Sequence, residues 1–417
     1  MTGDALESRV EYKLEYYSNG IVKRKIGVLN GKFHGEHTLY FPSGRKASTL
    51  NFREGKLSGE ATEYNEAGIL LKKFTYENDE LNGPGEIYYS DGNLEETVFF
   101  RNGKSEGKNV RYYPNGVVER EAVMRGGIPH GTCREYFLTG KLKTKCMYRD
   151  GKLNGREYGY YPNEILKMSA VYADGILNGR ANIYFPDGKL EKSLFYKDGK
   201  LEGRCILREP GGKLVSVSNY ADNKLQGKSI LYDKLGRRQY IVHYEANDMT
   251  GECRILYATG EIKQRAWLTK GVPDGIEIKY YKSGAVRKYS MFRKGTLHGF
   301  VMNYRSNGNL TSLTTFRNGV PCGFYIEFDQ TGSVYKRYQI LGDKKKVMTE
   351  RLPEAVILDI FLFIAEKTPY ERRTFRKARM DSGNGTVFLR MMKRQDPEKY
   401  RLDLSRYALA AFREIGF

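Results

Sequence analysis

The chain has 417 residues, a formal net charge of +20 and a sequence pI of about 9.4. It contains 46 glycines and 33 tyrosines but only 12 prolines and one tryptophan. This composition argues against intrinsic disorder and is typical of many short strands joined by glycine turns.

The N-terminal residues have no basic segment followed by an apolar run, so we expect no secretory signal peptide. The longest apolar run, residues 355–365, is too short to span a bilayer and contains Asp359. The five cysteines include no CxxC motif, which favours a reducing compartment. We therefore expect an intracellular protein that is soluble or peripheral to membranes.

A repeat with a period of 24 residues occupies most of the chain. No insertion or deletion breaks its register, and a partial copy that contains Tyr16 precedes the first full one. A strict period of this length is the signature of an array of repeated units. The most regular position is a glycine, called the anchor below, at Gly35, Gly59, Gly83, Gly107, Gly131, Gly155, Gly179, Gly203, Gly227, Gly251, Gly275, Gly299 and Gly323.

Two further positions of the repeat indicate turns. Four residues before the anchor the chain has Gly in most copies, and Asp79, Asn223 or Asn247 in the other three. Asp and Asn tolerate the left-handed conformation best after Gly, so we predict a positive φ at this position. Nine residues after the anchor another Gly recurs, in several copies after PS, SD, PN or PD, and only Glu164 breaks that series. This pattern predicts a second turn.

Aromatic residues lie between the two turns. Most copies have Tyr five residues after the anchor and an apolar, usually aromatic, residue seven residues before it. We therefore predict one β-hairpin per repeat, with aromatic rows that pack against those of neighbouring hairpins. A single hairpin is marginal in water, so the units are stable only together. The expected fold class is an all-β repeat array, an elongated, twisted antiparallel β-hairpin ribbon of about 13–14 units.

The pattern YxxxG…Y/FxxGKxxG resembles the MORN repeat in its variant form, over roughly residues 8–342. The resemblance implies an antiparallel β array used for scaffolding and for binding a protein partner. In some members it also implies contact with acidic phospholipids. Similar variant repeats occur in bacterial proteins labelled as antitoxins and in large DNA viruses.

The sequence divides into three segments. Residues 1–10 are a lead-in, residues 11–342 are the array, and residues 343–417 show helical patterning. Pro353 lies near one predicted helix start, and Asp396 begins another as an N-cap. We predict a small basic α-helical C-terminal domain, which would cap the unpaired edge of the last hairpin.

Catalytic motifs are absent from the sequence. The segment GKS at residues 227–229 lacks the glycine that a phosphate-binding loop needs at position 222, where the chain has Asp222. His34, His130 and His298 each precede an anchor, and we interpret them as surface turn residues. We expect no enzyme, no cofactor and no metal site.

Three cysteines share one register, because Cys133, Cys205 and Cys253 each lie two residues after an anchor. They are two or three repeats apart, which is too far for a disulfide or a common metal ion. We interpret them as small buried side chains.

Lysines recur three residues before the anchor and would line one edge of the array. Glu80, Ile128 and Ile176 interrupt the row. A basic edge attracts phosphates of lipid headgroups or of nucleic acid, and alternatively its lysines only discourage association between sheets. The candidate binding residues are Lys32, Lys56, Lys104, Lys152, Lys200 and Lys224.

Our first hypothesis is a non-enzymatic interaction scaffold that binds a protein partner, an anionic membrane surface or both through this basic ribbon. Alternatives are a nucleic-acid or virion-associated binding protein and a toxin-neutralising protein. A ubiquitin-ligase adaptor is a fourth hypothesis, because the segment LPEAVILDIF resembles part of an F-box. It lies at the opposite end of the chain from the usual layout. The ribbon could also form an edge-to-edge homodimer.

Overall fold

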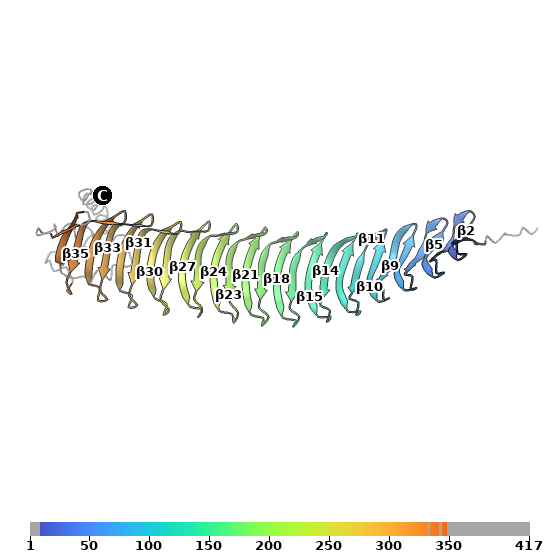
Figure 1. Cartoon of the computed structure of the whole chain (residues 1–417), viewed down its shortest axis with the longest axis horizontal. Helices are drawn as coiled ribbons and strands as arrows, with labels where there is room; N and C mark the ends of the chain where they lie inside the picture. Colours follow the sequence, from blue (N-terminus) through green and yellow to red (C-terminus); the bar gives the residue numbers. More distant parts are fainter. Residues whose placement is uncertain (1–8, 332–333, 342–343, 348–417) are drawn as a thin grey trace, which may run out of the picture. The chain divides into compact units, whose positions relative to one another are not determined.

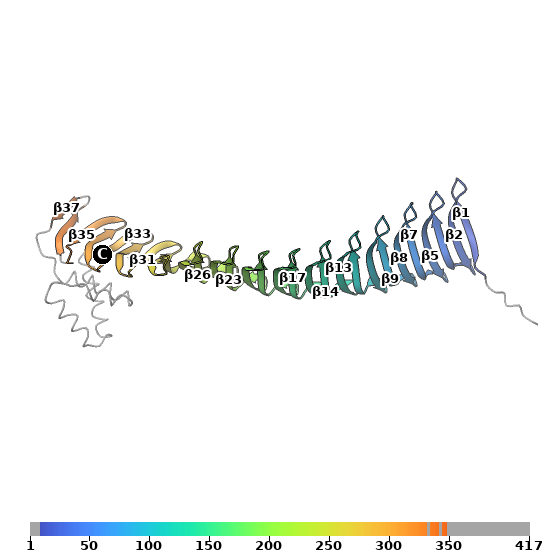
Figure 2. The ribbon, with the colours of Figure 1, turned by 90° about the horizontal axis from the view of Figure 1, so that it is seen from below.

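The computed structural model describes residues 9–331, 334–341 and 344–347. In this part of the chain the only regular secondary structure is β-strand. The chain divides into two compact units, Met1–Gly203 with Arg208–Gly212, and Arg204–Leu207 with Lys213–Phe417. In each unit the strands follow one another in chain order (Figures 1 and 2).

The first unit contains β1 (Glu11–Tyr16), β2 (Val22–Leu29), β3 (Lys32–Phe33), β4 (Gly35–Tyr40), β5 (Lys46–Arg53), β6 (Lys56–Leu57), β7 (Gly59–Tyr64), β8 (Leu70–Glu77), β9 (Glu80–Tyr88), β10 (Leu94–Arg101), β11 (Lys104–Ser105), β12 (Gly107–Tyr112), β13 (Val118–Arg125), β14 (Ile128–Tyr136), β15 (Leu142–Arg149), β16 (Lys152–Leu153), β17 (Gly155–Tyr160), β18 (Leu166–Ala173), β19 (Ile176–Leu177), β20 (Gly179–Tyr184), β21 (Leu190–Lys197) and β22 (Lys200–Leu201).

Strand β23 (Gly203–Arg208) contains residues of both units. The second unit contains β24 (Leu214–Ala221), β25 (Lys224–Leu225), β26 (Gly227–Tyr232), β27 (Arg238–Glu245), β28 (Asp248–Met249), β29 (Gly251–Leu256), β30 (Ile262–Thr269), β31 (Val272–Tyr280), β32 (Val286–Arg293), β33 (Thr296–Tyr304), β34 (Leu310–Arg317), β35 (Val320–Phe328), β36 (Val334–Leu341) and β37 (Lys344–Val347).

Each repeat is one antiparallel hairpin, as the sequence predicts. An eight-residue strand such as β5 turns into the two-residue β6, where Phe52 pairs with Leu57 and Arg53 with Lys56. An irregularity follows at Ser58, and the six-residue β7 continues the pairing with β5. In some repeats the two pieces merge into one nine-residue strand such as β9. The described residues therefore confirm the all-β hairpin ribbon.

The first turn of the repeat has two consecutive residues with positive φ, as in Glu54 (53°) and Gly55 (88°). This is the geometry of a type I′ turn, whose twist matches that of the flanking strands. The predicted left-handed residues are confirmed, with φ values of 74° at Asp79, 67° at Asn223 and 79° at Asn247.

The anchor glycine is required for two reasons. Its φ is positive, at 104° in Gly155 and 129° in Gly179. In addition, a Cβ placed on Gly179 would lie only 3.0 Å from the Cβ of Val171 on the preceding strand. A side chain at the anchor would therefore be strained by the backbone, and at Gly179 it would also collide with the preceding strand.

Hydrogen bonds at both edges join each repeat to the next. At the first turn, the N–H of Gly55 donates to the carbonyl of Phe33 at 2.8 Å, and later first turns repeat this bond. At the second turn, the Tyr113 hydroxyl donates to the carbonyl of Tyr136, which lies 23 residues later, at 2.9 Å. The array is thus continued by the turns as well as by the strands.

The sheet is thin, so few large side chains of the first unit are fully buried. Around β13 to β15 the core contains Ala122, Cys133 and Cys146, with the half-buried Tyr148 and Leu153 packed against them. The predicted aromatic rows are half-buried in the same way. In the second unit a larger core contains Ile278, Val286, Tyr289, Phe300, Met302, Tyr304, Leu310, Leu313, Ile326 and Phe328.

The array extends further than predicted. Residues 344–347, which we assigned to the helical segment, form β37 and pair with β36 from Leu341↔Lys344 to Tyr338↔Val347. Strand pairing uses backbone groups, so a lysine-rich segment can join the ladder that its composition did not suggest. The other residues of the predicted helical domain, 348–417 and 343, lie outside the described residues.

The two requirements at the anchor can be separated by two alanine variants. In Gly179→Ala the new methyl group is strained by the positive φ and also crowds Val171. In Gly107→Ala it is strained by the positive φ alone, since nothing lies within 4 Å of the added Cβ. We expect the local opening free energy to fall by about 1 kcal/mol in G107A and by about 2–4 kcal/mol in G179A. Amide hydrogen exchange in the mutated strand and its neighbours measures this. Equal losses would show that the contact with Val171 contributes nothing.

The tyrosine hydrogen bond at the second turn predicts opposite effects for two substitutions. Tyr113→Phe removes the bond to Tyr136 and should lower the local opening free energy by about 1 kcal/mol. Phe137 occupies the same register in the next repeat, so Phe137→Tyr should add a similar bond and slow exchange there. Exchange that is unchanged in both variants would contradict a stabilising role for this hydroxyl.

Candidate interaction surface

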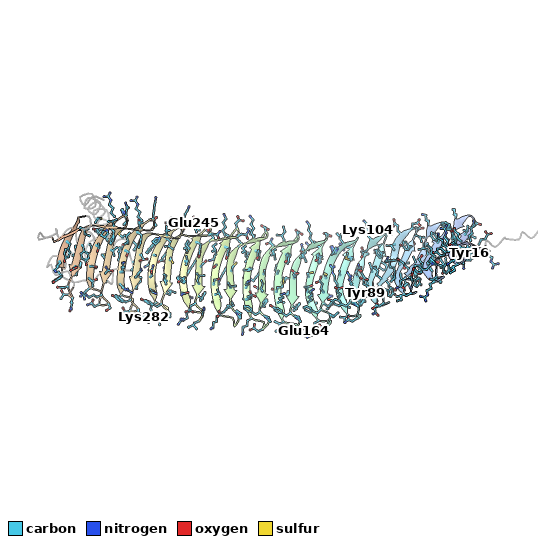
Figure 3. All side chains as sticks on the ribbon, in the orientation of Figure 1. Tyr16, Tyr89, Lys104, Glu164, Glu245 and Lys282 are labelled. Carbon is cyan, nitrogen blue, oxygen red and sulfur yellow. The ribbon has the colours of Figure 1, made fainter. Side chains whose placement is uncertain are left out.

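The six predicted lysines lie at the first-turn edge. Each is exposed and belongs to a two-residue strand that directly follows a first turn: β3, β6, β11, β16, β22 or β25. Five of them belong to the first unit, whereas Lys224 belongs to the second. Figure 3 shows Lys104 at this edge and Glu164 at the opposite edge of the same unit.

A second basic row lies opposite these lysines, and the sequence reasoning missed it. Arg53 pairs with Lys56, and Arg101 pairs with Lys104. The same arrangement recurs at Arg149↔Lys152 and Lys197↔Lys200. Like charges that face each other directly destabilise a sheet. Reading the position six residues before each anchor would have revealed this row.

Acidic residues nevertheless interrupt the edge. Glu54, Asp150 and Asp198 occupy first turns between the basic pairs, and the repeat that ends at Gly83 has Glu77, Asp79 and Glu80 instead. The edge is therefore a mixture of both signs and not a continuous basic strip. An edge of mixed charge discourages association between sheets.

A different surface stands out on the sheet face opposite the core. Sixteen residues after the anchor, five consecutive repeats of the first unit have an apolar residue that no core contact requires. Phe99 is 41% exposed, Val123 38%, Met147 50% and Phe195 39%, and Val171 is half-buried. The residue directly opposite on the paired strand is Pro84, Lys108, Thr132, Arg156 or Arg180. We call these ten residues the apolar–basic row.

The anchor glycines keep the row open. On the side away from its paired residue, the apolar side chain lies next to the following anchor in four of the five repeats, the exception being Phe99. A Cβ on Gly131 would lie 3.3 Å from the Cβ of Val123, and one on Gly155 would lie 3.9 Å from the Cβ of Met147. The feature that the fold requires in every repeat thus leaves these apolar side chains uncovered.

The row has a defined start within the first unit. In the preceding repeats of the first unit the same register has Asn51 and Thr75, which face Glu36 and Glu60. The row therefore begins at the repeat of Pro84 and Phe99.

The arginines of the row are available for a partner. Arg156 and Arg180 are both exposed, and within the part of the chain that the structure describes neither forms an ion pair. Lys108, by contrast, lies 2.6 Å from Glu121, and this contact is the main cause that lowers the pKa of the Glu121 carboxyl. The free positive charge of the row therefore comes from the two arginines.

The described residues offer no alternative site for metal chemistry. Residues 9–331, 334–341 and 344–347 contain no group of three or more His, Cys, Asp or Glu that could hold an ion. The ring of His130 instead lies 3.2 Å from the Asp150 carboxylate, across two neighbouring turns. No helix in the same residues is long and apolar enough to cross a membrane.

Among solved structures, the chain is similar to one described as TcdB2-TccC3-TEV, at 13% identity and a TM-score of 0.16. The match covers 81% of this chain but 20% of the other, so the chain spans about a fifth of that protein's length. A Tc holotoxin pore of Photorhabdus luminescens matches at 9% identity and a TM-score of 0.12, over 83% and 23% of the two chains. Scores this low carry no argument. No curated protein matches the chain.

The family model described as the MORN repeat variant matches five segments, residues 57–78, 81–102, 105–124, 129–150 and 177–198. All five lie in the first unit, and they include four of the five residue pairs of the apolar–basic row, the exception being Arg156 and Val171. The matched segments keep the period and the turns that the structure shows. The chain thus contains repeats of the MORN variant type between residues 57 and 198.

Proposed function

We propose that this chain is a non-enzymatic interaction scaffold that docks a protein partner along the apolar–basic row. The observation that supports this most directly is the run of five consecutive hairpins with an apolar residue in this register. Four of these residues are exposed, and the last two lie opposite arginines that form no ion pair among the described residues. Exposed apolar patches that are contiguous and bordered by polar residues mark interaction sites more often than isolated apolar residues do. Arginine and large apolar residues are also the side chains enriched in protein interfaces.

The spacing of the row suggests the kind of partner. Each repeat contributes two main strands, so equivalent residues recur about every 10 Å across the sheet. In an α-helix, residues seven positions apart are separated by about 10.5 Å along the axis. A partner helix that lies across the strands could therefore place one apolar residue per repeat beside Phe99, Val123, Met147, Val171 and Phe195. Acidic residues halfway between them would meet Arg156 and Arg180.

Other binding hypotheses fit the charges less well. Duplex nucleic acid and anionic membranes both favour a continuous basic surface, whereas the first-turn edge alternates basic residues with Glu54, Asp150 and Asp198. Neither ligand uses apolar residues at regular intervals on a flat sheet face. A toxin-neutralising role would be one case of the proposal, with the toxin as the protein partner.

The proposal can be tested with two sets of variants of the full chain that differ in the surface they change. The first is Phe99→Thr with Met147→Thr and Phe195→Thr, and the array already accepts Thr75 in this register. The matched control is Lys56→Glu with Lys104→Glu and Lys152→Glu, and Glu80 occupies that register. A protein captured from host-cell extract at moderate salt should bind at least tenfold more weakly to the first set (about 1.4 kcal/mol), and with unchanged affinity to the second.

Two further probes distinguish the alternatives. Vesicles that contain phosphatidylserine and a random-sequence DNA duplex are each offered to the unaltered chain as salt is raised. Loss of partner binding only in the lysine control would overturn the proposal and favour the basic edge. Retention of vesicles or of DNA at moderate salt, without any captured protein, would favour the membrane or nucleic-acid hypothesis instead.

A further inference from the structure

The core face of the first unit contains two cysteines that lie directly opposite each other. Cys133 on β14 pairs with Cys146 on β15, in a ladder that runs from Gly131↔Tyr148 to Tyr136↔Leu142. Both are free thiols, and they are only 4% and 7% exposed. The shared register of Cys133, Cys205 and Cys253 relates cysteines of different repeats. It does not reveal Cys146, which lies on the strand paired with that of Cys133.

The other described pairs at this register do not share the arrangement. The equivalent positions are Ala61↔Phe74 in an earlier repeat and Cys253↔Ala266 in a later one. Cys253 therefore provides a natural comparison, because it is a cysteine in the same register with no thiol opposite it.

The geometry suits a covalent bond between the two sulfurs. Residues that face each other in antiparallel strands have Cα atoms about 4.5 or 5.5 Å apart, and both values lie within the disulfide range of about 4.4–6.8 Å. Their Cβ atoms are about 4.5–5.5 Å apart, and a disulfide needs about 3.5–4.5 Å. The bond would thus need a small approach of the side chains and no change in strand pairing.

The surroundings also favour a thiolate at Cys133. The Arg120 Nε donates a hydrogen bond to its sulfur at 3.5 Å. The hydrogen bond with the Cys146 thiol is the main cause that lowers the pKa of Cys133, with a further contribution from Arg120 and opposition from burial. The same interaction raises the pKa of Cys146. Cys133 is therefore the thiol of the pair that deprotonates more readily to attack, while Cys146 keeps its proton.

We propose that Cys133 and Cys146 form a reversible disulfide across β14 and β15, made by exchange with a low-molecular-weight disulfide. The Cys133 thiolate attacks one sulfur of the reagent, which breaks its S–S bond, releases one thiolate and leaves a mixed disulfide on Cys133. Cys146 then loses its proton to solvent and attacks the Cys133 sulfur, which releases the second thiolate. The chain loses two electrons and two protons, and the reagent is reduced to two thiols.

The disulfide would act on the hairpin at the centre of the apolar–basic row. Thr132 and Met147 are the neighbours of the two cysteines along their strands, and they face the row on the opposite side of the sheet. Closing a loop of about 15 residues restricts the opening of a hairpin. We therefore expect oxidation to slow amide exchange in β14 and β15 by roughly 100-fold. The redox site does not depend on the proposed partner.

The test uses the full chain under native conditions. It is equilibrated with reduced and oxidised glutathione over a range of ratios, acid-quenched, alkylated, digested and mapped by mass spectrometry. We expect a disulfide-linked peptide pair that joins Cys133 to Cys146. The linked pair should form, and amide exchange in β14 and β15 should slow, at the same ratio of reduced to oxidised glutathione. Because the sulfurs are buried, the reaction should follow transient opening of the hairpin and be slow.

Variants provide the matched comparison. Cys253→Ser should keep the linked pair and its redox midpoint, whereas Cys146→Ala should leave a glutathione adduct on Cys133 and no slowing of exchange. The mapping of the unaltered chain decides the question even if a variant folds poorly. The proposal would be overturned if Cys133 and Cys146 stayed open to alkylation at every ratio after local opening. Links to Cys205 or Cys253 as often as to each other would also overturn it.

Discussion

The first turn of each repeat is the constraint on which the rest of the structure depends. It needs two consecutive left-handed residues, followed after a short interval by an anchor that must also have positive φ. All thirteen copies have glycine at the anchor, because a side chain there would strain the backbone. At anchors such as Gly179 it would also approach the preceding strand. A single inserted residue would move the turns out of register and flip the following side chains to the other face.

This constraint acts on the edges and leaves the faces free to vary. The backbone bonds at the first turn and the tyrosine hydroxyls at the second continue the array whatever the strands carry. The core face of the first unit can therefore hold small residues, thiols or half-buried aromatics. The opposite face changes from Glu60 and Thr75 to Arg156 and Val171 while the strand pairing stays the same. Function in such an array is best sought in registers that change between repeats, and not in those that stay constant.

Much of the fold was predictable from the sequence because turn chemistry is local. The positive φ of Asp79, Asn223 and Asn247 followed from their register alone. Glu164 shows the limit of that reasoning, since it breaks the glycine series but keeps a φ of 67°. The strand at residues 344–347 was missed because backbone pairing does not depend on the lysines that such a segment carries.

The candidate site was predicted less well, because it depends on which positions face each other across strands. The lysine register was visible along the chain, but the opposing arginines and the acidic turn residues change its meaning. The apolar–basic row requires the pairing of Arg180 with Phe195 to be known, and the cysteine pair requires the same knowledge for Cys133 and Cys146. Spacing along the sequence showed neither relation, although the register sixteen residues after the anchor contained the apolar half of the row.

The central claim is that the face with the apolar–basic row, and not the first-turn edge, contacts a partner. A photo-reactive side chain placed at Met147, and separately at Lys152 of the neighbouring edge, tests this in host-cell extract. The account predicts a single crosslinked protein from position 147 and none from position 152. Crosslinking from position 152 alone would contradict it and return the function to the basic edge.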